Sequence, residues 1–109
     1  MNSPAKEILT SNQKKFIIDM FEVVVKNSVK KTVLKMPKQE QLKFATLLSA
    51  LKISGPEQPQ FMNYSKLGNK NYHCLLSRKW VACWTFEKGT LTIEVYYAGS
   101  RESAPYAKH

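Results

Sequence analysis

Three short apolar segments joined by turn sequences restrict the fold of this chain more than any other feature of its sequence. They run from Tyr72 to Ser77, from Trp80 to Phe86 and from Thr90 to Tyr97, with Arg-Lys and Glu-Lys-Gly turns between them. Connections this short can join only antiparallel strands, because parallel neighbours need a crossover of a dozen or more residues. The sequence therefore predicts an antiparallel meander at the end of the chain.

The last of these segments predicts a sheet with two different faces. Apolar and polar residues alternate along it with the period of two that a half-buried strand shows. One face should pack on the rest of the core, and that face is expected to carry Leu91, Ile93, Val95 and Tyr97. The opposite face, with Thr92, Glu94 and Tyr96, is expected to be wet or partly covered.

Two helices are predicted upstream of the strands. Asn27 and Ser28 suit the N-cap of the first, and Pro37 separates it from the second and suits a helix start. The second helix repeats apolar residues at the spacing of one helical face. A helical hairpin should thus cover one face of the sheet. The core is expected to contain Phe44, Leu47, Leu48, Leu51, Val81, Cys83, Ile93 and Val95.

The segment before the helices is ambiguous. Residues 16–24 place apolar side chains at helical spacing, whereas Phe21 to Val25 have the β-branched density of a strand. We favour a strand at about residues 20–25, with a continuous helix as the alternative. Residues 1–15 are polar and are expected to form an N-terminal extension to a domain of residues 16–109.

A long connection follows the second helix. Residues 55–71 contain several Gly and Pro residues among other turn formers. Loops of this length in a small domain either cover the core or carry function. The sequence leaves both interpretations open.

The charge of the chain indicates its kind of partner. It has 109 residues, with 17 Lys and Arg against 8 Asp and Glu, which gives a formal net charge of +9. One domain of this size carries a field that attracts nucleic acid or an acidic protein. The alternative is a basic protein that is merely soluble. Neither a membrane-spanning run nor a signal peptide is present, so we expect a cytoplasmic protein.

The two cysteines do not predict a metal site. Cys74 and Cys83 lie in apolar segments and are too few for a four-ligand zinc site. We interpret both as reduced core residues and expect neither a metal nor a cofactor.

The order strand, helix, helix, three strands and basic tail resembles the RelE/ParE toxin superfamily. The residues that carry the resemblance are VVVKNSVKKTVLKMPKQEQLKFATLLSALKISGP, KLGNKNYHCLLSRKWVACW and IEVYYAGSRESAPY. It implies an α+β fold of the order β-α-α-β-β-β, with the helical hairpin packed on a twisted antiparallel sheet. It also implies a type II toxin that forms a hetero-oligomer with an acidic or DNA-binding antitoxin. Such toxins either cleave mRNA on the ribosome without a metal or, in the ParE branch, poison gyrase without cleaving RNA.

The resemblance also suggests catalytic residues. Arg101 matches a tail arginine that stabilises the transition state, and Tyr106 matches a tail tyrosine that stacks on or protonates the nucleotide. His73 falls where the RNA-cleaving branch has basic residues on its second strand. An imidazole with an ordinary pKa near 6.5 can accept a proton near neutral pH, which makes His73 the best candidate base. The alternative is a structural histidine hydrogen-bonded to a neighbour.

Further cations are candidates for binding RNA. In the RNA-cleaving toxins the third strand has an arginine near its start, whereas this chain has Trp80 there. Either the preceding turn residues substitute for it, or the site cleaves poorly. Solvated surface positions are the alternative for each lysine. The candidates are Lys66, Lys70, Arg78, Lys79, Lys108 and His109.

Overall fold

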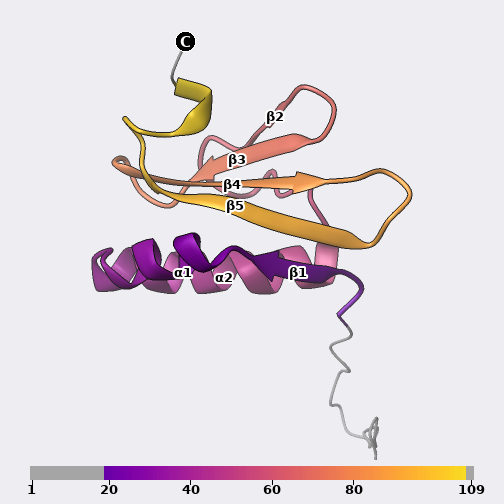
Figure 1. Ribbon diagram of the computed structural model, residues 1–109, viewed down its shortest axis with the longest axis horizontal. Coiled ribbons are helices and arrows are strands. Elements are labelled where there is room, and N and C mark those ends of the chain that lie inside the picture. Colours follow the sequence, from indigo (N-terminus) through magenta and orange to yellow (C-terminus); the bar gives the residue numbers. More distant parts are fainter. Residues whose placement is uncertain (1–18, 108–109) are drawn as a thin grey trace, which may run out of the picture.

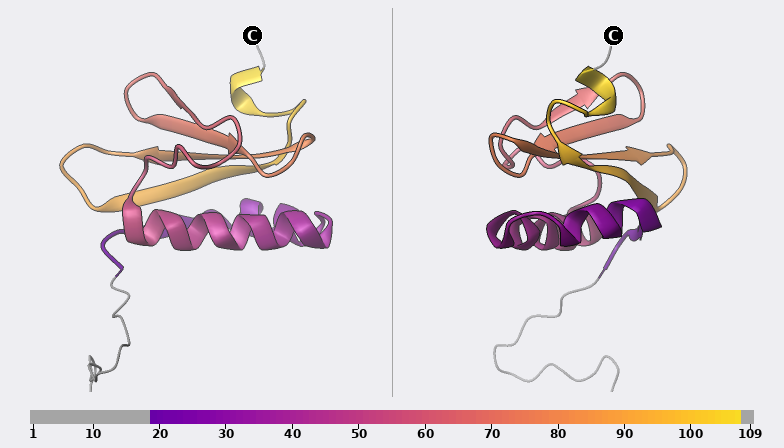
Figure 2. Two further views of the ribbon diagram at one scale, coloured as in Figure 1. Left: turned by 180° about the vertical axis from the view of Figure 1, so that it is seen from behind. Right: turned by 60° about the vertical axis from the view of Figure 1, so that its left-hand side comes forward.

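Two helices cover one face of a five-stranded sheet in this computed structural model, which describes residues 19–107 (Figure 1). A short 3-10 helix near the C-terminus lies on the other face (Figure 2). The expected N-terminal extension lies outside the described residues. The elements in chain order are β1 Glu22–Val25, α1 Asn27–Leu34, α2 Lys38–Ser54, β2 Ser65–Leu67, β3 Asn71–Leu75, β4 Trp80–Phe86, β5 Thr92–Ser100 and η1 Pro105–Ala107.

The sheet contains the predicted meander together with two further strands. Its order is β1-β5-β4-β3-β2, and β3, β4 and β5 are consecutive antiparallel neighbours, as predicted. The expected antiparallel sheet is mixed in the structure, because β1 pairs with β5 in parallel. No tight turn joins β1 to β5. The direction of β1 is therefore free of the constraint that short turns impose on β3, β4 and β5.

The predicted strand and helical hairpin are both present, with a different cap. Lys26, not Asn27 or Ser28, is the N-cap of α1, and its side chain makes no capping bond. The backbone N–H of Lys26 donates to the carbonyl of Val95 on β5, so the chain passes directly from β1 into the helix. Asn27 and Ser28 therefore fall in the first turn, and Pro37 caps α2.

A β-bulge in β5 changes which side chains face the helices. The register pairs Cys83 with Tyr97 but Trp84 with Val95, which leaves Tyr96 as the extra residue. Ile93 and Val95 face the helices as predicted. Tyr97 faces the opposite side, because the extra residue at Tyr96 shifts the alternation of side chains in the rest of the strand. Leu91 precedes the strand and is 61% exposed.

The long connection after α2 covers the core. The buried amide of Gln58 donates from Nε2 to the carbonyls of Ala50 and Gly55, at 3.0 and 2.8 Å. Phe61 and Tyr64 from this segment pack against the main apolar cluster. The sequence missed β2 within the segment, which adds a short strand beside β3.

The main core lies between the helices and the sheet. Trp84 is fully buried, stacks on Tyr72 at a centroid distance of 6.0 Å, and donates from Nε1 to the carbonyl of Pro56 at 3.0 Å. Of the predicted core residues, Leu48 is half-buried and the others are buried. Cys74 and Cys83 are buried and free, as predicted.

Candidate functional site on the open face of the sheet

The face of the sheet turned away from the helices carries a second, smaller apolar cluster. Leu75 and Val81 pair across β3 and β4 and are buried with Ala104 of the tail. Tyr97 and Tyr106 pack around them. Because the cluster joins the strands to the tail, it fixes residues 104–106 against this open face.

Backbone hydrogen bonds complete the attachment of the tail. The N–H of Arg101 donates to the carbonyl of Lys79 at 2.8 Å, and the N–H of Ala104 donates to the carbonyl of Arg101 at 3.3 Å. The chain then forms η1 above the sheet (Figure 1). This path brings Tyr106 back over the strands.

The returning tail places Tyr106 against His73. Their ring centroids are 4.2 Å apart, with an interplanar angle of 50°. The positive charge of Arg101, in the same tail, contributes to the lowered pKa of His73 and opposes the rise in the pKa of Tyr106. The three side chains named as catalytic candidates from the sequence are therefore neighbours in space.

The imidazole of His73 lies in surroundings that keep it neutral. Its pKa is lowered, mainly by burial and further by the positive charge of Arg101, while the backbone of Ser65 opposes the shift. Ser65 is its cross-strand partner on β2. The Nδ1 atom is buried and has no hydrogen-bond partner among the described residues. A neutral imidazole at pH 7 can accept a proton.

The phenol of Tyr106 stays protonated at neutral pH. Burial is the main cause that raises its pKa, the Cys83 thiol adds to the rise, and Arg101 opposes it. The Cys83 thiol lies beneath the site on β4, directly across from His73. Burial raises the pKa of Cys83 to about 12. Because a thiolate is the reactive form of cysteine, Cys83 is not suited to act as a nucleophile here.

A cationic cleft lies where the turn between β3 and β4 meets the tail. Arg78, Lys79 and Arg101 line it together with Ser100 and Glu102, and its volume is about 600 Å³. The turn between β3 and β4 supplies the first two, and the tail supplies the third. Nη1 of Arg101 lies 3.5 Å from the carbonyl of Arg78, which orients the guanidinium along this turn. Trp80 at the start of β4 instead packs against the helix-side core.

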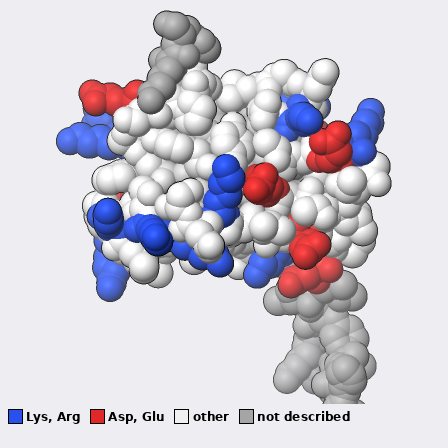
Figure 3. All heavy atoms as spheres, in the orientation of Figure 1, with Lys and Arg blue, Asp and Glu red and all other residues white. Residues whose placement is uncertain are grey.

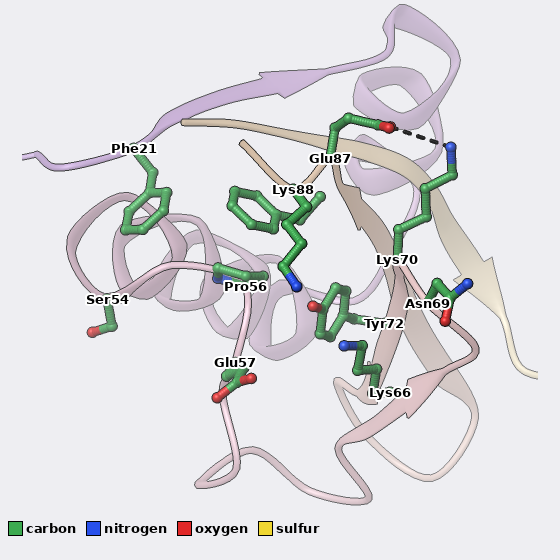
Figure 4. A pocket seen from close by; sticks show the side chains of 11 residues that line it. Phe21, Ser54, Pro56, Glu57, Lys66, Asn69, Lys70, Tyr72, Glu87 and Lys88 are labelled. Carbon is green, nitrogen blue, oxygen red and sulfur yellow. Dashed lines mark hydrogen bonds and ion pairs between the residues drawn. The ribbon is translucent and has the colours of Figure 1, made fainter. Parts of the chain in front are cut away.

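Two of the predicted RNA-binding lysines lie elsewhere. Lys66 lies over the ring of Tyr72, with Nζ 5.6 Å from the centroid, and Lys70 forms a 3.2 Å ion pair with Glu87. Both line a different pocket, shown in Figure 4. Lys108 and His109 lie outside the described residues.

Tyr97 is a site residue that the sequence did not reveal. Its hydroxyl donates to the carbonyl of Ser100 at 2.8 Å, immediately before Arg101. The side chain crosses so close to Gly99 that a Cβ there would lie 2.8 Å from the Tyr97 oxygen. A larger residue at position 99 would therefore displace the Tyr97 hydroxyl. The alternation of β5 assigned Tyr97 to the opposite face, and nothing in the sequence signals the bulge.

The remaining features of the described residues define no other centre. Within residues 19–107, no group of three or more His, Cys, Asp or Glu side chains is placed to hold a metal ion. In the same range, no helix has the length and apolar character needed to cross a membrane.

The fold is that of known toxins. In the archaeal RelE–RelB complex from Pyrococcus horikoshii OT3, one chain matches with a TM-score of 0.63 and 15% identity, over 78% of this chain and 99% of that one. This chain has the RelE fold. The RelE fold also appears in the E. coli DinJ–YafQ toxin–antitoxin complex, with a TM-score of 0.61 and 11% identity over 77% and 96% of the two chains.

A third structure with the RelE fold is the YoeB dimer from Staphylococcus aureus. It has a TM-score of 0.57 and 13% identity, over 73% of this chain and 95% of that one. No protein-family model matches the sequence, and no curated protein matches it significantly. The resemblance to the RelE/ParE superfamily is therefore confirmed for the fold, and the activity has to be argued from the site.

Proposed function

We propose that this protein is the toxin of a type II toxin–antitoxin pair and that it cleaves mRNA on the ribosome without a metal ion. The observation that carries the proposal is the approach of the His73 and Tyr106 rings to 4.2 Å, with both rings under the influence of the positive charge of Arg101. A neutral imidazole, a protonated phenol and fixed cations are the groups that metal-independent RNA cleavage needs.

The cleavage step assigns one role to each group. His73 takes the proton of a ribose 2′-hydroxyl, and the freed oxygen attacks the adjacent phosphorus. The bond from phosphorus to the 5′-oxygen of the next nucleotide breaks, and Tyr106 donates its hydroxyl proton to that oxygen. The products are a 2′,3′-cyclic phosphate and a 5′-hydroxyl end. Arg101 stabilises the negative charge that develops on the phosphorane.

His73 acts through Nε2 in this scheme, because Nδ1 is buried. Acceptance at Nε2 requires the neutral tautomer that carries its hydrogen on Nδ1. The backbone carbonyl of Ser65, the cross-strand partner of His73, is the acceptor proposed for this hydrogen, and the ring must turn toward it to form the bond, because Nδ1 has no hydrogen-bond partner among the described residues. Such a second partner commonly fixes which nitrogen of a histidine is protonated.

Arg78 and Lys79 are proposed as the clamp for a neighbouring phosphate. Both are exposed and share the cleft with Arg101. The absence of an arginine at the start of the third strand, where this chain has Trp80, favours a ParE-like binding toxin that poisons gyrase. The position of Arg78 and Lys79 beside Arg101 favours cleavage, since two cations from the turn occupy the cleft.

An acidic antitoxin is the proposed protein partner. Two of the solved structures with this fold are complexes whose names pair a toxin with a second protein, RelB or DinJ. The chain carries a net charge of +9, and Lys and Arg side chains are visible along the helical layer in Figure 3. Opposite charge on a partner would speed its capture.

Expression of the chain in a bacterial host tests the proposal. Growth and protein synthesis should slow, and mRNA recovered from the cells should contain new 5′-hydroxyl ends. Co-expression of the protein encoded beside it should restore growth. Folded protein that accumulates without slowing growth would contradict toxin function, and inhibited gyrase with intact mRNA would establish the ParE-like alternative.

A further inference from the structure

A second pocket lies on the opposite face of the sheet from the candidate catalytic site. Its volume is about 830 Å³, and it is formed by the end of α2, the turn between β2 and β3, and the end of β4 (Figure 4). Tyr72 contributes to this pocket, whereas its neighbour His73 faces the tail. Successive residues of a strand point to opposite faces, so β3 separates the two sites.

The apolar wall of this pocket is preformed. Phe21 and Phe86 meet edge to face with their centroids 5.9 Å apart, and both remain partly exposed. Gly55 at the end of α2 has a φ of +94°, and a Cβ there would lie 2.8 Å from the Phe21 ring. The wall therefore depends on a glycine at this position and is held by the backbone around it.

The charged side chains of the pocket are of both signs. Lys70 is paired with Glu87 at 3.2 Å, and Glu57 supplies a second carboxylate. Lys66 and Lys88 form no ion pair with the described residues. In Figure 4 their amines point toward the same part of the pocket as the Tyr72 hydroxyl. The pocket thus offers two ammonium groups beside an aromatic wall.

We propose that this pocket binds a peptide segment of a protein partner, one that presents a carboxylate next to an apolar side chain. The carboxylate would lie between Lys66 and Lys88, and the apolar side chain would pack on Phe21 and Phe86. Three lysines and two glutamates line the pocket, so its net charge is only +1, which favours a ligand with a single carboxylate over the repeated phosphates of an RNA strand.

The proposal concerns the regulation of the toxin, and in that respect it rests on the proposed function. The partner would be the antitoxin, attached at a site separated from the cationic cleft by the thickness of the sheet. A segment bound here leaves the cleft open. Inhibition would therefore need a second segment of the partner on the open face, and loss of that segment alone would restore cleavage while the complex persists.

Nuclear magnetic resonance on the isotopically labelled full chain tests the pocket directly. The probe is the peptide acetyl-Leu-Leu-Glu-amide, and its Gln counterpart and AMP are the comparison ligands. The Glu peptide should shift the amide signals of residues 54–57, 66–72 and 86–88 in a saturable manner. The Gln peptide should bind several-fold more weakly, and AMP should leave these signals in place.

Two double variants complete the test. Lys66→Gln with Lys88→Gln should weaken Glu-peptide binding roughly tenfold, since each exposed ion pair contributes modestly. Lys31→Gln with Lys35→Gln removes the same charge from the exposed surface around the end of α1 and should change nothing. Absent shifts, equal binding of the two peptides, or shifts of the same signals by AMP would overturn the proposal. Because these readouts need neither cleavage nor toxicity, they succeed or fail independently of the proposed function.

Discussion

The ring of His73 and the ring of Tyr106 lie 4.2 Å apart although thirty-three positions separate them in the chain. The contact exists because the tail turns back after β5 and is held by the small cluster of Leu75, Val81 and Ala104. A neutral imidazole and a protonated phenol are thereby placed on one face of the sheet, under the influence of the charge of Arg101. The predictions below depend on this arrangement.

The pH dependence of cleavage should report His73. Its pKa lies below the ordinary value of 6.5, and only the neutral form accepts a proton. The rate should therefore be constant around pH 7 to 8 and fall about tenfold per unit below the lowered pKa. In His73→Gln the cleavage rate should fall about 10²–10⁴-fold, and the further decline of the rate at acidic pH (the acidic limb) should disappear.

The measurement is the single-turnover rate of RNA cleavage between pH 5 and pH 9. Circular dichroism at each pH serves as a control. A protonated His73 is disfavoured in the folded state, so the stability that this group contributes is complete above pH 6.5 and declines as the pH falls. A half-maximal rate above pH 7, or an acidic limb that persists in His73→Gln, would contradict the role of His73.

Tyr106→Phe separates proton donation from stacking. The variant keeps the ring against His73 and removes the hydroxyl, so RNA binding should be nearly unchanged while the cleavage rate falls by at least about 10²-fold. Tyr106→Ala should weaken binding as well, because a stacked base typically contributes about 1–3 kcal/mol. Rates and binding constants for both variants are the measurement. Wild-type cleavage by Tyr106→Phe would exclude the phenol as the acid.

Tyr97→Phe should loosen the tail. The lost hydrogen bond to the Ser100 carbonyl should lower the free energy of unfolding by about 1 kcal/mol. The cleavage rate should fall, by up to about 10²-fold if Arg101 is displaced by an ångström. Denaturant unfolding and single-turnover cleavage measure the two effects.

Tyr96→Phe is the matched control for this prediction. The Tyr96 hydroxyl interacts with the Cys83 thiol, and it makes no hydrogen bond to residues 101–107 of the tail. Its removal should therefore leave the cleavage rate within about twofold of the wild type, a margin that corresponds to less than 1 kcal/mol. Equal losses of cleavage in Tyr96→Phe and Tyr97→Phe would show that the bond to Ser100 does not position Arg101.

Much of the fold could be predicted from local signals. Pro37 separates two helices of clear periodicity, and short turns force β3, β4 and β5 into a meander. The pairing of β1 with β5 could not be predicted, because no local turn determines the partner or direction of an isolated strand. The strand β2 was missed because its three residues lie among turn formers.

The candidate site was predictable in its residue types and less so in its geometry. His73, Arg101 and Tyr106 were recognised by resemblance, and the structure brings them together. The role of Tyr97 depends on a bulge at Tyr96, which exchanges the faces to which the later side chains of β5 point. No distinctive residue type marks this bulge in the sequence. Lys66 and Lys70 were predicted to bind RNA as cations of the long connection, but they line the pocket on the other face.

Cleavage of ribosome-bound mRNA by the wild type and by Arg101→Ala tests the central claim most directly. Arg101 is exposed and lies beyond β5, so its loss should leave the fold intact, as circular dichroism can verify. Removing its charge from the developing phosphorane should slow cleavage about 10²–10³-fold. Lys52→Ala, in the last turn of α2, should cleave at the wild-type rate. Equal rates for the wild type and Arg101→Ala, or a wild type that leaves mRNA intact, would contradict the claim.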